Sequence, residues 1–227
     1  MTRLESRARL FACCLSALAG FVDALGFIQS GGFFVSFMSG NSTRLGVGVA
    51  QNMLNAIAAA GIIVCFVAGV VAGTLLGTRF DRRRPAAVLL AIAFLLAAAA
   101  LLERIGSLGY GITLLAFAMG AENAVFERDG EVRFGVTYMT GSLVRVGNGI
   151  ASAILGRDGN GWFGYLLLWL AFVVGVVGGA FSYRAVGGAS LWVATAAAAA
   201  LALGSLGVRP RVFEATPSGR ASGSETP

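Results

Sequence analysis

Six long apolar stretches limit the folds open to this chain more than any other feature of its sequence. They cover residues 10–28, 56–78, 86–102, 108–126, 162–183 and 189–206. A transmembrane helix needs about 20 mostly apolar residues, and each stretch is close to that length. Transmembrane β-strands would be about 10 residues long with alternating polarity, which these stretches do not show. We therefore expect an all-α polytopic membrane protein with about six spanning helices.

The composition supports a lipid environment. The 227 residues are 57% hydrophobic and 12% charged, whereas soluble domains are near 45–50% apolar and about 25% charged. The lipid bilayer is thus the expected partner. The net charge of +6 does not indicate nucleic acid, because the arginines collect in loops and tails and no nucleic-acid motif accompanies them.

The arginines also predict an orientation. Those that we place on the cytoplasmic side are Arg3, Arg7, Arg9, Arg79, Arg82, Arg83, Arg84, Arg128, Arg133, Arg157, Arg209, Arg211 and Arg220. Only Arg104 and Arg184 fall on the opposite side. By the positive-inside rule, we expect six spans with both termini in the cytoplasm.

The N-terminus imitates a secretory signal, because arginines precede an apolar run that ends in Ala17-Leu18-Ala19. The apolar run continues through Phe27, and the segment has a counterpart later in the chain. We therefore expect an uncleaved first spanning helix.

An internal duplication is the strongest further signal. Residues 35–50 (VSFMSGNSTRLGVGVA) match residues 136–151 (VTYMTGSLVRVGNGIA) at a constant offset of 101. Farther on, FVAGVVAG at 66–73 matches FVVGVVGG at 172–179. Upstream, Gly20 and Asp23-Ala24 align more weakly with Gly120 and Asn123-Ala124.

The duplication predicts two membrane repeats, at 1–105 and 106–206, followed by a disordered cytoplasmic tail at 207–227 that is rich in Ser, Pro, Gly and Thr. Each repeat has three spanning stretches, which is an odd number. The second repeat must then enter the membrane from the opposite side, as in the inverted repeats of many transporters and channels. This holds only if the motif segments do not cross the bilayer.

The repeated Met-(Ser/Thr)-Gly motif resembles a helix start. Ser39 or Asn41, and Thr140 or Ser142, are good N-cap residues. Short helices can follow, from about residue 42 to 52 and from about 143 to 155, and we predict broken or re-entrant helices there. Their positive ends, with Arg44 and Arg145 in the first turn, would suit an anion. Interfacial helices with snorkelling arginines are the alternative.

Three polar residues inside apolar stretches are further candidates: Asp23 in the first, and Glu122 and Asn123 in the fourth. Ionisable groups at membrane depth are costly and are usually paired. We expect Arg44 or Arg145 as partners. A proton-coupling carboxylate and a structural ion pair between the repeats fit equally well.

The candidate substrate-binding residues are Asp23, Gly40, Asn41, Arg44, Glu122, Asn123, Gly141, Ser142 and Arg145. No cofactor or metal is expected, and the chain contains no His. Glycines at 69, 73 and 77, and at 175 and 179, form GxxxG patterns that favour helix packing, including contact between the repeats. Such faces also allow a homo-oligomer.

The stretch GFVDALGFIQSGGFFVSFMSGNSTRLG at 20–46, with AMGAENAVF at 118–126 and TYMTGSLVRVG at 137–147, resembles the YoaK-like multi-pass membrane proteins. The resemblance covers nearly the whole chain except the tail. It implies a bacterial plasma-membrane protein with about six or seven helices. That family has no settled biochemical function, so the resemblance assigns no catalytic or ligand-binding residues. Ser142 stands where Asn41 stands in the first repeat, so the two caps need not be equivalent.

The function that the sequence favours is a transporter or channel for a small solute, including an anionic one. A non-transporting membrane scaffold or assembly partner is the alternative. We do not expect an enzyme, because a lipid-directed activity would have to work without His, HExxH, GxSxG or a P-loop.

Overall fold

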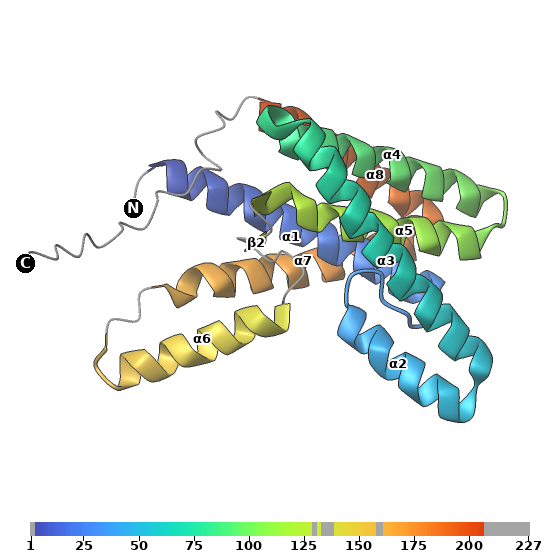
Figure 1. Cartoon of the computed structure of the whole chain (residues 1–227), viewed down its shortest axis with the longest axis horizontal. Helices are drawn as coiled ribbons and strands as arrows, with labels where there is room; N and C mark the ends of the chain where they lie inside the picture. Colours follow the sequence, from blue (N-terminus) through green and yellow to red (C-terminus); the bar gives the residue numbers. More distant parts are fainter. Residues whose placement is uncertain (1–2, 129–130, 133–138, 158–160, 207–227) are drawn as a thin grey trace, which may run out of the picture.

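The computed structural model describes residues 3–128, 131–132, 139–157 and 161–206. Eight α-helices carry the fold within these ranges (Figure 1). They are α1 (Arg3–Gln29), α2 (Met38–Gln51), α3 (Met53–Arg79), α4 (Arg84–Arg104), α5 (Leu108–Glu122), α6 (Met139–Ile154), α7 (Trp162–Val186) and α8 (Ser190–Leu206). The predicted disordered tail lies outside the described residues.

The other regular elements are short. They are the 3₁₀ helices η1 (Asp81–Arg83), η2 (Asn123–Phe126) and η3 (Gly187–Ala189), and the strands β1 (Glu127–Arg128) and β2 (Glu131–Val132). The two strands pair antiparallel. Apart from this small hairpin, the regular elements of the described residues are helical, which confirms the predicted all-α class.

Five segments of the described residues are long and apolar enough to cross a membrane. They are Arg7–Gln29, Met53–Arg79, Arg84–Arg104, Leu108–Phe126 and Trp162–Leu206. The last has 45 residues and contains both α7 and α8, which η3 separates. Each predicted apolar stretch falls within one of these segments. The prediction of several membrane-length helices is therefore confirmed.

Helices suit these segments because lipid offers the backbone no hydrogen-bond partners. The boundary between α2 and α3 shows how one helix ends and the next begins. Asn52 follows α2, and its side-chain oxygen accepts hydrogen bonds from the N–H groups of Leu54 (3.1 Å) and Asn55 (3.4 Å). This N-cap starts α3 at once, so α2 and α3 form a tight hairpin.

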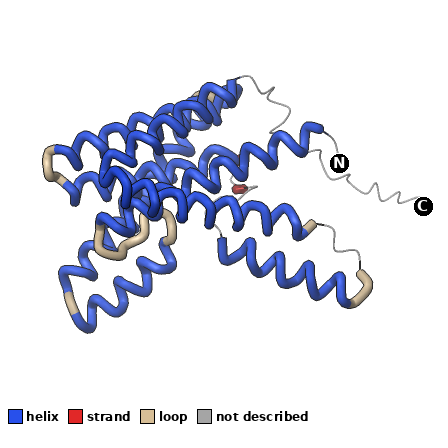
Figure 2. Tube along the Cα trace, turned by 180° about the vertical axis from the view of Figure 1, so that it is seen from behind, coloured by secondary structure: helices blue, strands red, loops and turns tan. Residues whose placement is uncertain are grey.

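The main helix pairs join the two predicted repeats: α1 packs on α7, α3 on α5, and α4 on α8. Figure 1 shows α4 and α8 together along the upper edge, with α1 and α7 across the middle. The short helices α2 and α6 pack on α3 and α7 respectively, and both lie along the lower edge in Figures 1 and 2.

Glycines bring α3 and α5 into backbone contact. A Cβ atom on Gly69 would overlap the carbonyl oxygen of Phe117, and one on Gly73 would lie 2.8 Å from the Cα of Ala121. Only glycine allows so close an approach. The prediction that the GxxxG face of this span contacts the other repeat is confirmed.

The pair α1 and α7 repeats this contact. A Cβ on Gly175 would overlap the carbonyl oxygen of Ala17, and one on Gly179 would lie 2.6 Å from the carbonyl oxygen of Phe21. Gly69 aligns with Gly175 and Gly73 aligns with Gly179, so aligned glycines make the close contacts in both helix pairs.

Large apolar side chains cover the outward face of α3. Ile57, Val64, Val67, Val71 and Leu75 are 54–66% exposed. Soluble proteins rarely leave such a continuous apolar strip uncovered. Acyl chains cover it in a bilayer, as the sequence composition predicts.

Candidate functional site

The chain reverses direction after α1. Gly31 and Gly32 have φ angles of 70° and 112°, in the region that favours glycine. The Ser30 hydroxyl accepts a hydrogen bond from the N–H of Phe33 (2.9 Å) and donates one to the carbonyl oxygen of Phe33 (3.0 Å). These contacts fold residues 30–33 into a tight turn and send the following residues back along α1.

Asp23 holds the returning segment. Its Oδ1 atom accepts hydrogen bonds from the N–H groups of Val35 and Ser36, at 2.8 Å each. Asp23 is buried and lies six residues before Gln29, which places it about 9 Å back along the helix axis at 1.5 Å per residue. The segment that precedes α2 therefore returns to a level well inside α1.

The helix α2 begins at that level, and its start differs from the prediction. It runs from Met38, its N-cap residue is Phe37, and no side chain caps it. The predicted cap roles of Ser39 and Asn41 are therefore wrong, because both residues lie inside the first turn. Sequence reasoning placed the start too late because the motif resembles a cap, although the helix already includes it.

Asn41 instead ties α2 to the preceding loop. It is fully buried, its Nδ2 donates to the carbonyl oxygen of Phe34 (2.6 Å), and its Oδ1 accepts from the N–H of Phe34 (3.0 Å). Gly40 leaves room for two rings, because a Cβ there would lie 2.6 Å from Phe37 and 2.9 Å from Phe34. Both motif residues thus have packing and anchoring roles.

Arg44 lies two turns into α2, in a groove between α2 and α3. Its guanidinium carbon lies 5.1 Å from the centre of the Phe33 ring, a cation–π contact. The groove has a volume of about 480 Å³. Its lining residues are Phe33, Gly40, Thr43, Arg44, Val47, Gly48, Gln51, Asn52 and Asn55.

The expected pairing of Asp23 with Arg44 or Arg145 is wrong. Backbone amides, not a guanidinium, satisfy Asp23, and both arginines lie over aromatic rings. The turn after α1 explains the difference, because it places the N–H groups of Val35 and Ser36 within hydrogen-bond distance of the Asp23 carboxylate. Sequence reasoning also missed Gln51 and Asn55, whose only signal was a cluster of amides between two apolar stretches.

The second motif lies at the start of α6, whose described part begins at Met139. Ser142 is buried inside this helix, so the predicted N-cap roles of Thr140 and Ser142 do not hold. A Cβ at Gly141 would meet open space. Arg145 is exposed, with its guanidinium carbon 4.9 Å from the centre of the Tyr165 ring. The motif residues before 139 lie outside the described residues.

The candidates from the two repeats do not form one cluster. In Figure 1, α2 and α6 run outward in opposite directions from the middle of the molecule, carrying Arg44 and Arg145 on separate helices. Glu122 ends α5 and Asn123 begins η2, and these two elements pack mainly on α3 and α4. Asn123 is buried, and its Nδ2 donates to the carbonyl oxygens of Met119 (3.1 Å) and Gly120 (3.3 Å).

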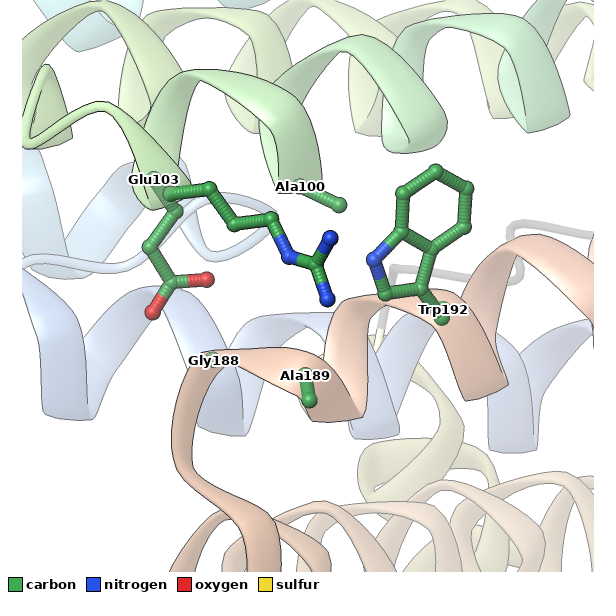
Figure 3. Close-up of a pocket in the computed structure, with 6 residues that line it drawn as sticks. Ala100, Glu103, Gly188, Ala189 and Trp192 are labelled. Carbon is green, nitrogen blue, oxygen red and sulfur yellow. The ribbon is translucent and has the colours of Figure 1, made fainter.

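A second, smaller pocket of about 190 Å³ lies where α4 ends beside η3 and α8 (Figure 3). Its lining residues are Ala100, Glu103, Arg104, Gly188, Ala189 and Trp192. A Cβ on Gly188 would overlap the Glu103 carboxylate, so glycine is needed for this side chain to lie here. The pocket was not predicted from the sequence.

Membrane-length helices, backbone-close glycine contacts and buried polar side chains define an α-helical multi-pass membrane protein. Residues 11–204 match the family described as Protein of unknown function (DUF1275), and the chain belongs to this family. It is 38% identical over 197 residues to the UPF0700 transmembrane protein RA0705 of Rhizobium meliloti (strain 1021), over 86% of this chain and 85% of that protein. No solved structure matches. The resemblance to YoaK-like membrane proteins is thereby confirmed.

Proposed function

We propose that the chain is a transporter or channel for a small anionic solute, built from two repeats that enter the bacterial plasma membrane from opposite sides. The observation that carries this proposal is the return of the chain to Asp23, which starts α2 beside the interior of α1. A bilayer core is about 30 Å thick, so a start about 9 Å before the end of α1 would lie within it.

The length of α2 supports a re-entrant arrangement. With 14 residues it is about 21 Å long, too short to span. It then reverses directly into α3, and a Cβ on Gly48 would lie 2.7 Å from the backbone nitrogen of Ala56. A helix that starts inside the bilayer and leaves on the side where α1 ended fits these contacts, whereas an interfacial helix would not need the return to Asp23.

Equivalent contacts in the two repeats support the inverted symmetry. A Cβ on Gly20 would lie 3.1 Å from the backbone nitrogen of Val176, and one on Gly120 would lie 3.0 Å from that of Val70. In each repeat, one apolar segment of membrane length precedes the short helix α2 or α6, and two further apolar helices follow it. If α2 and α6 do not cross, each repeat crosses three times, and the second repeat is reversed relative to the first.

The groove beside α2 is the favoured anion site. Its lining combines the guanidinium of Arg44 with the side-chain amides of Gln51, Asn52 and Asn55, and it contains no carboxylate. A guanidinium and several amide donors together suit a carboxylate or a similar small anion.

Transport by purified protein tests the proposal. Vesicles containing the protein should release entrapped chloride, acetate or inorganic phosphate faster than glucose. Arg44→Gln should slow anion release by roughly tenfold or more, because a hydrogen bond to a charged group contributes about 1.5–3 kcal/mol. Arg104→Gln, in the separate pocket beside α8, is the matched control and should release anions at the wild-type rate.

The same vesicles distinguish the alternative. A folded wild-type protein that releases none of these anions would favour a non-transporting membrane scaffold or assembly partner. Release that Arg44→Gln leaves unchanged would remove the groove as the anion site. Size-exclusion profiles of both variants establish that a lost activity does not reflect a lost fold.

A further inference from the structure

Glu122 is the most completely buried acidic side chain among the described residues. It is 0% exposed, and neither Oε1 nor Oε2 has a hydrogen-bond partner there. It ends α5, and the residues of η2 that follow, Asn123 to Phe126, are all buried. A carboxyl group without partners in such surroundings is a strong sign of a bound ligand or a transferable ion.

Packing does not require an acid at this position. The matching contacts of Gly20 and Gly120 with the opposite repeat equate Glu122 with Val22, which is also 0% exposed. The first repeat therefore fills the same place in the fold with an apolar side chain. Glu122 introduces a desolvation cost that its counterpart avoids, so a structural role does not explain it.

Asp23 provides the contrast. It is buried on the equivalent helix of the other repeat, but two backbone N–H groups at 2.8 Å satisfy it. The structure thus separates the two buried acids: Asp23 anchors the segment before α2, whereas Glu122 has its oxygens available for a ligand.

The surroundings of Glu122 favour a proton over a metal ion. The described residues contain no group of three or more His, Cys, Asp or Glu side chains that could hold a metal. Divalent cations such as Ca²⁺ and Mg²⁺ take about six or more oxygen ligands, which a single carboxyl group cannot supply. One isolated carboxyl oxygen is sufficient for a proton.

Charged side chains on the neighbouring elements do not hydrogen-bond to Glu122 in this conformation. The charged side chains that the structure describes on the helices packed against α5 and η2 are Arg7, Arg9 and Asp23 on α1, Arg79 on α3, and Arg84, Glu103 and Arg104 on α4. None of them donates a hydrogen bond to the Glu122 oxygens, and the side chain is closed off from solvent.

We propose that Glu122 is a proton-binding site that holds its proton in this closed conformation and releases it to water when the helices around α5 separate. On release the carboxyl O–H bond breaks and the proton passes to water, which leaves a carboxylate; rebinding reverses the step. The proton site itself does not depend on the proposed transport function. Only its role, which is to couple the movement of the solute to the movement of a proton, rests on that function.

Carbodiimide labelling tests the site without any transport assay. Dicyclohexylcarbodiimide adds to protonated carboxyl groups in apolar surroundings and leaves a stable acylurea that peptide mass spectrometry locates. In native membranes we expect labelling at Glu122 and not at Asp23. Labelling should fall about tenfold per pH unit once the group loses its proton. Wild-type protein without label at Glu122, or with equal label at Asp23, would overturn the proposal.

Infrared spectroscopy of the purified protein provides an independent measurement. The carbonyl band of a protonated carboxylic acid should vanish in Glu122→Gln and persist in Asp23→Asn. If Glu122→Gln does not fold, Glu122→Val replaces it, because Val22 occupies the equivalent position. A band that persists in the Glu122 variant would contradict a proton on this residue.

The two proposals can fail separately. Vesicles that enclose a pH-sensitive dye and are given a gradient of inorganic phosphate measure proton movement beside anion movement. If Glu122 is labelled in a protein that moves no anion, the transport proposal is refuted and the proton-site proposal stands. If anions move but Glu122 is not labelled, only the proton-site proposal is refuted.

Discussion

Replacing Gly69 by Ala should push α3 away from α5. The added Cβ would lie 2.9 Å from the Cα of Phe117 and would overlap its carbonyl oxygen. Carbon atoms prefer separations of about 3.5–4.0 Å, so the helices must separate by roughly 1 Å along this contact. Both contacting groups are backbone, and neither can move aside as a flexible side chain can.

The expected loss follows from two opposing effects. Overpacking a tight interface costs about 1–3 kcal/mol. Alanine recovers about 1 kcal/mol in intrinsic helix propensity over glycine, a gain measured in water. We therefore expect a net destabilisation of up to about 2 kcal/mol from Gly69→Ala.

Matched substitutions give the prediction its controls. Gly175→Ala should destabilise by a similar amount, because the added Cβ would overlap the Ala17 carbonyl oxygen in the same way. Gly61→Ala lies on the same helix as Gly69, and its Cβ would meet open space. That variant should be as stable as the wild type or slightly more stable.

Unfolding of the detergent-solubilised protein by heat or denaturant, followed by intrinsic fluorescence, measures these differences. The expected order of midpoints places Gly61→Ala at or above the wild type, with the two interface variants together below it. If Gly69→Ala and Gly175→Ala both have the same unfolding midpoint as Gly61→Ala, the close backbone contact between the repeats does not exist as described.

Three further predictions concern the first turn, a helix cap and the orientation. Asp23→Ala should lower the unfolding midpoint more than Asp23→Asn, because hydrogen bonds to a charged group contribute about 1.5–3 kcal/mol and Asn keeps an acceptor oxygen; equal midpoints would contradict the anchoring role. Asn52→Ala should destabilise by about 1 kcal/mol through the lost α3 cap, measured by the same unfolding, whereas Asn52→Asp should not. In a background without native cysteines, a cysteine at Gly106 should react with an impermeant maleimide in intact cells, and one at Arg157 only after permeabilisation; the reverse pattern would refute the proposed orientation.

The positions of the long helices could be predicted from the sequence because the signal is local. An apolar run of about 20 residues favours a helix whatever its neighbours are, since lipid leaves the backbone no other partner. The glycine faces were also readable, because GxxxG spacing places small residues on one side of a helix. Gly69 and Gly175 do lie at the contacts between the repeats.

The candidate site was predicted only in part. Burial of Asp23 and Glu122 follows from the apolar stretches that contain them and is observed. Their partners were not predictable, because Asp23 bonds to backbone amides that the sequence pattern does not mark. The start of α2 was misplaced for a related reason: propensity favours Asn41 as a cap, but its contacts with Phe34 in the folded chain place it inside the helix.

The sequence by itself determined that the chain is helical, crosses a membrane several times and contains a duplicated motif, because these properties follow from the chemistry of contiguous residues. Only the tertiary structure decided that α1 lies against α7 and α3 against α5, that Asp23 is satisfied, and that Glu122 is not. Those outcomes depend on which surfaces meet across the two repeats, and contacts between residues about a hundred positions apart leave no local pattern in the chain.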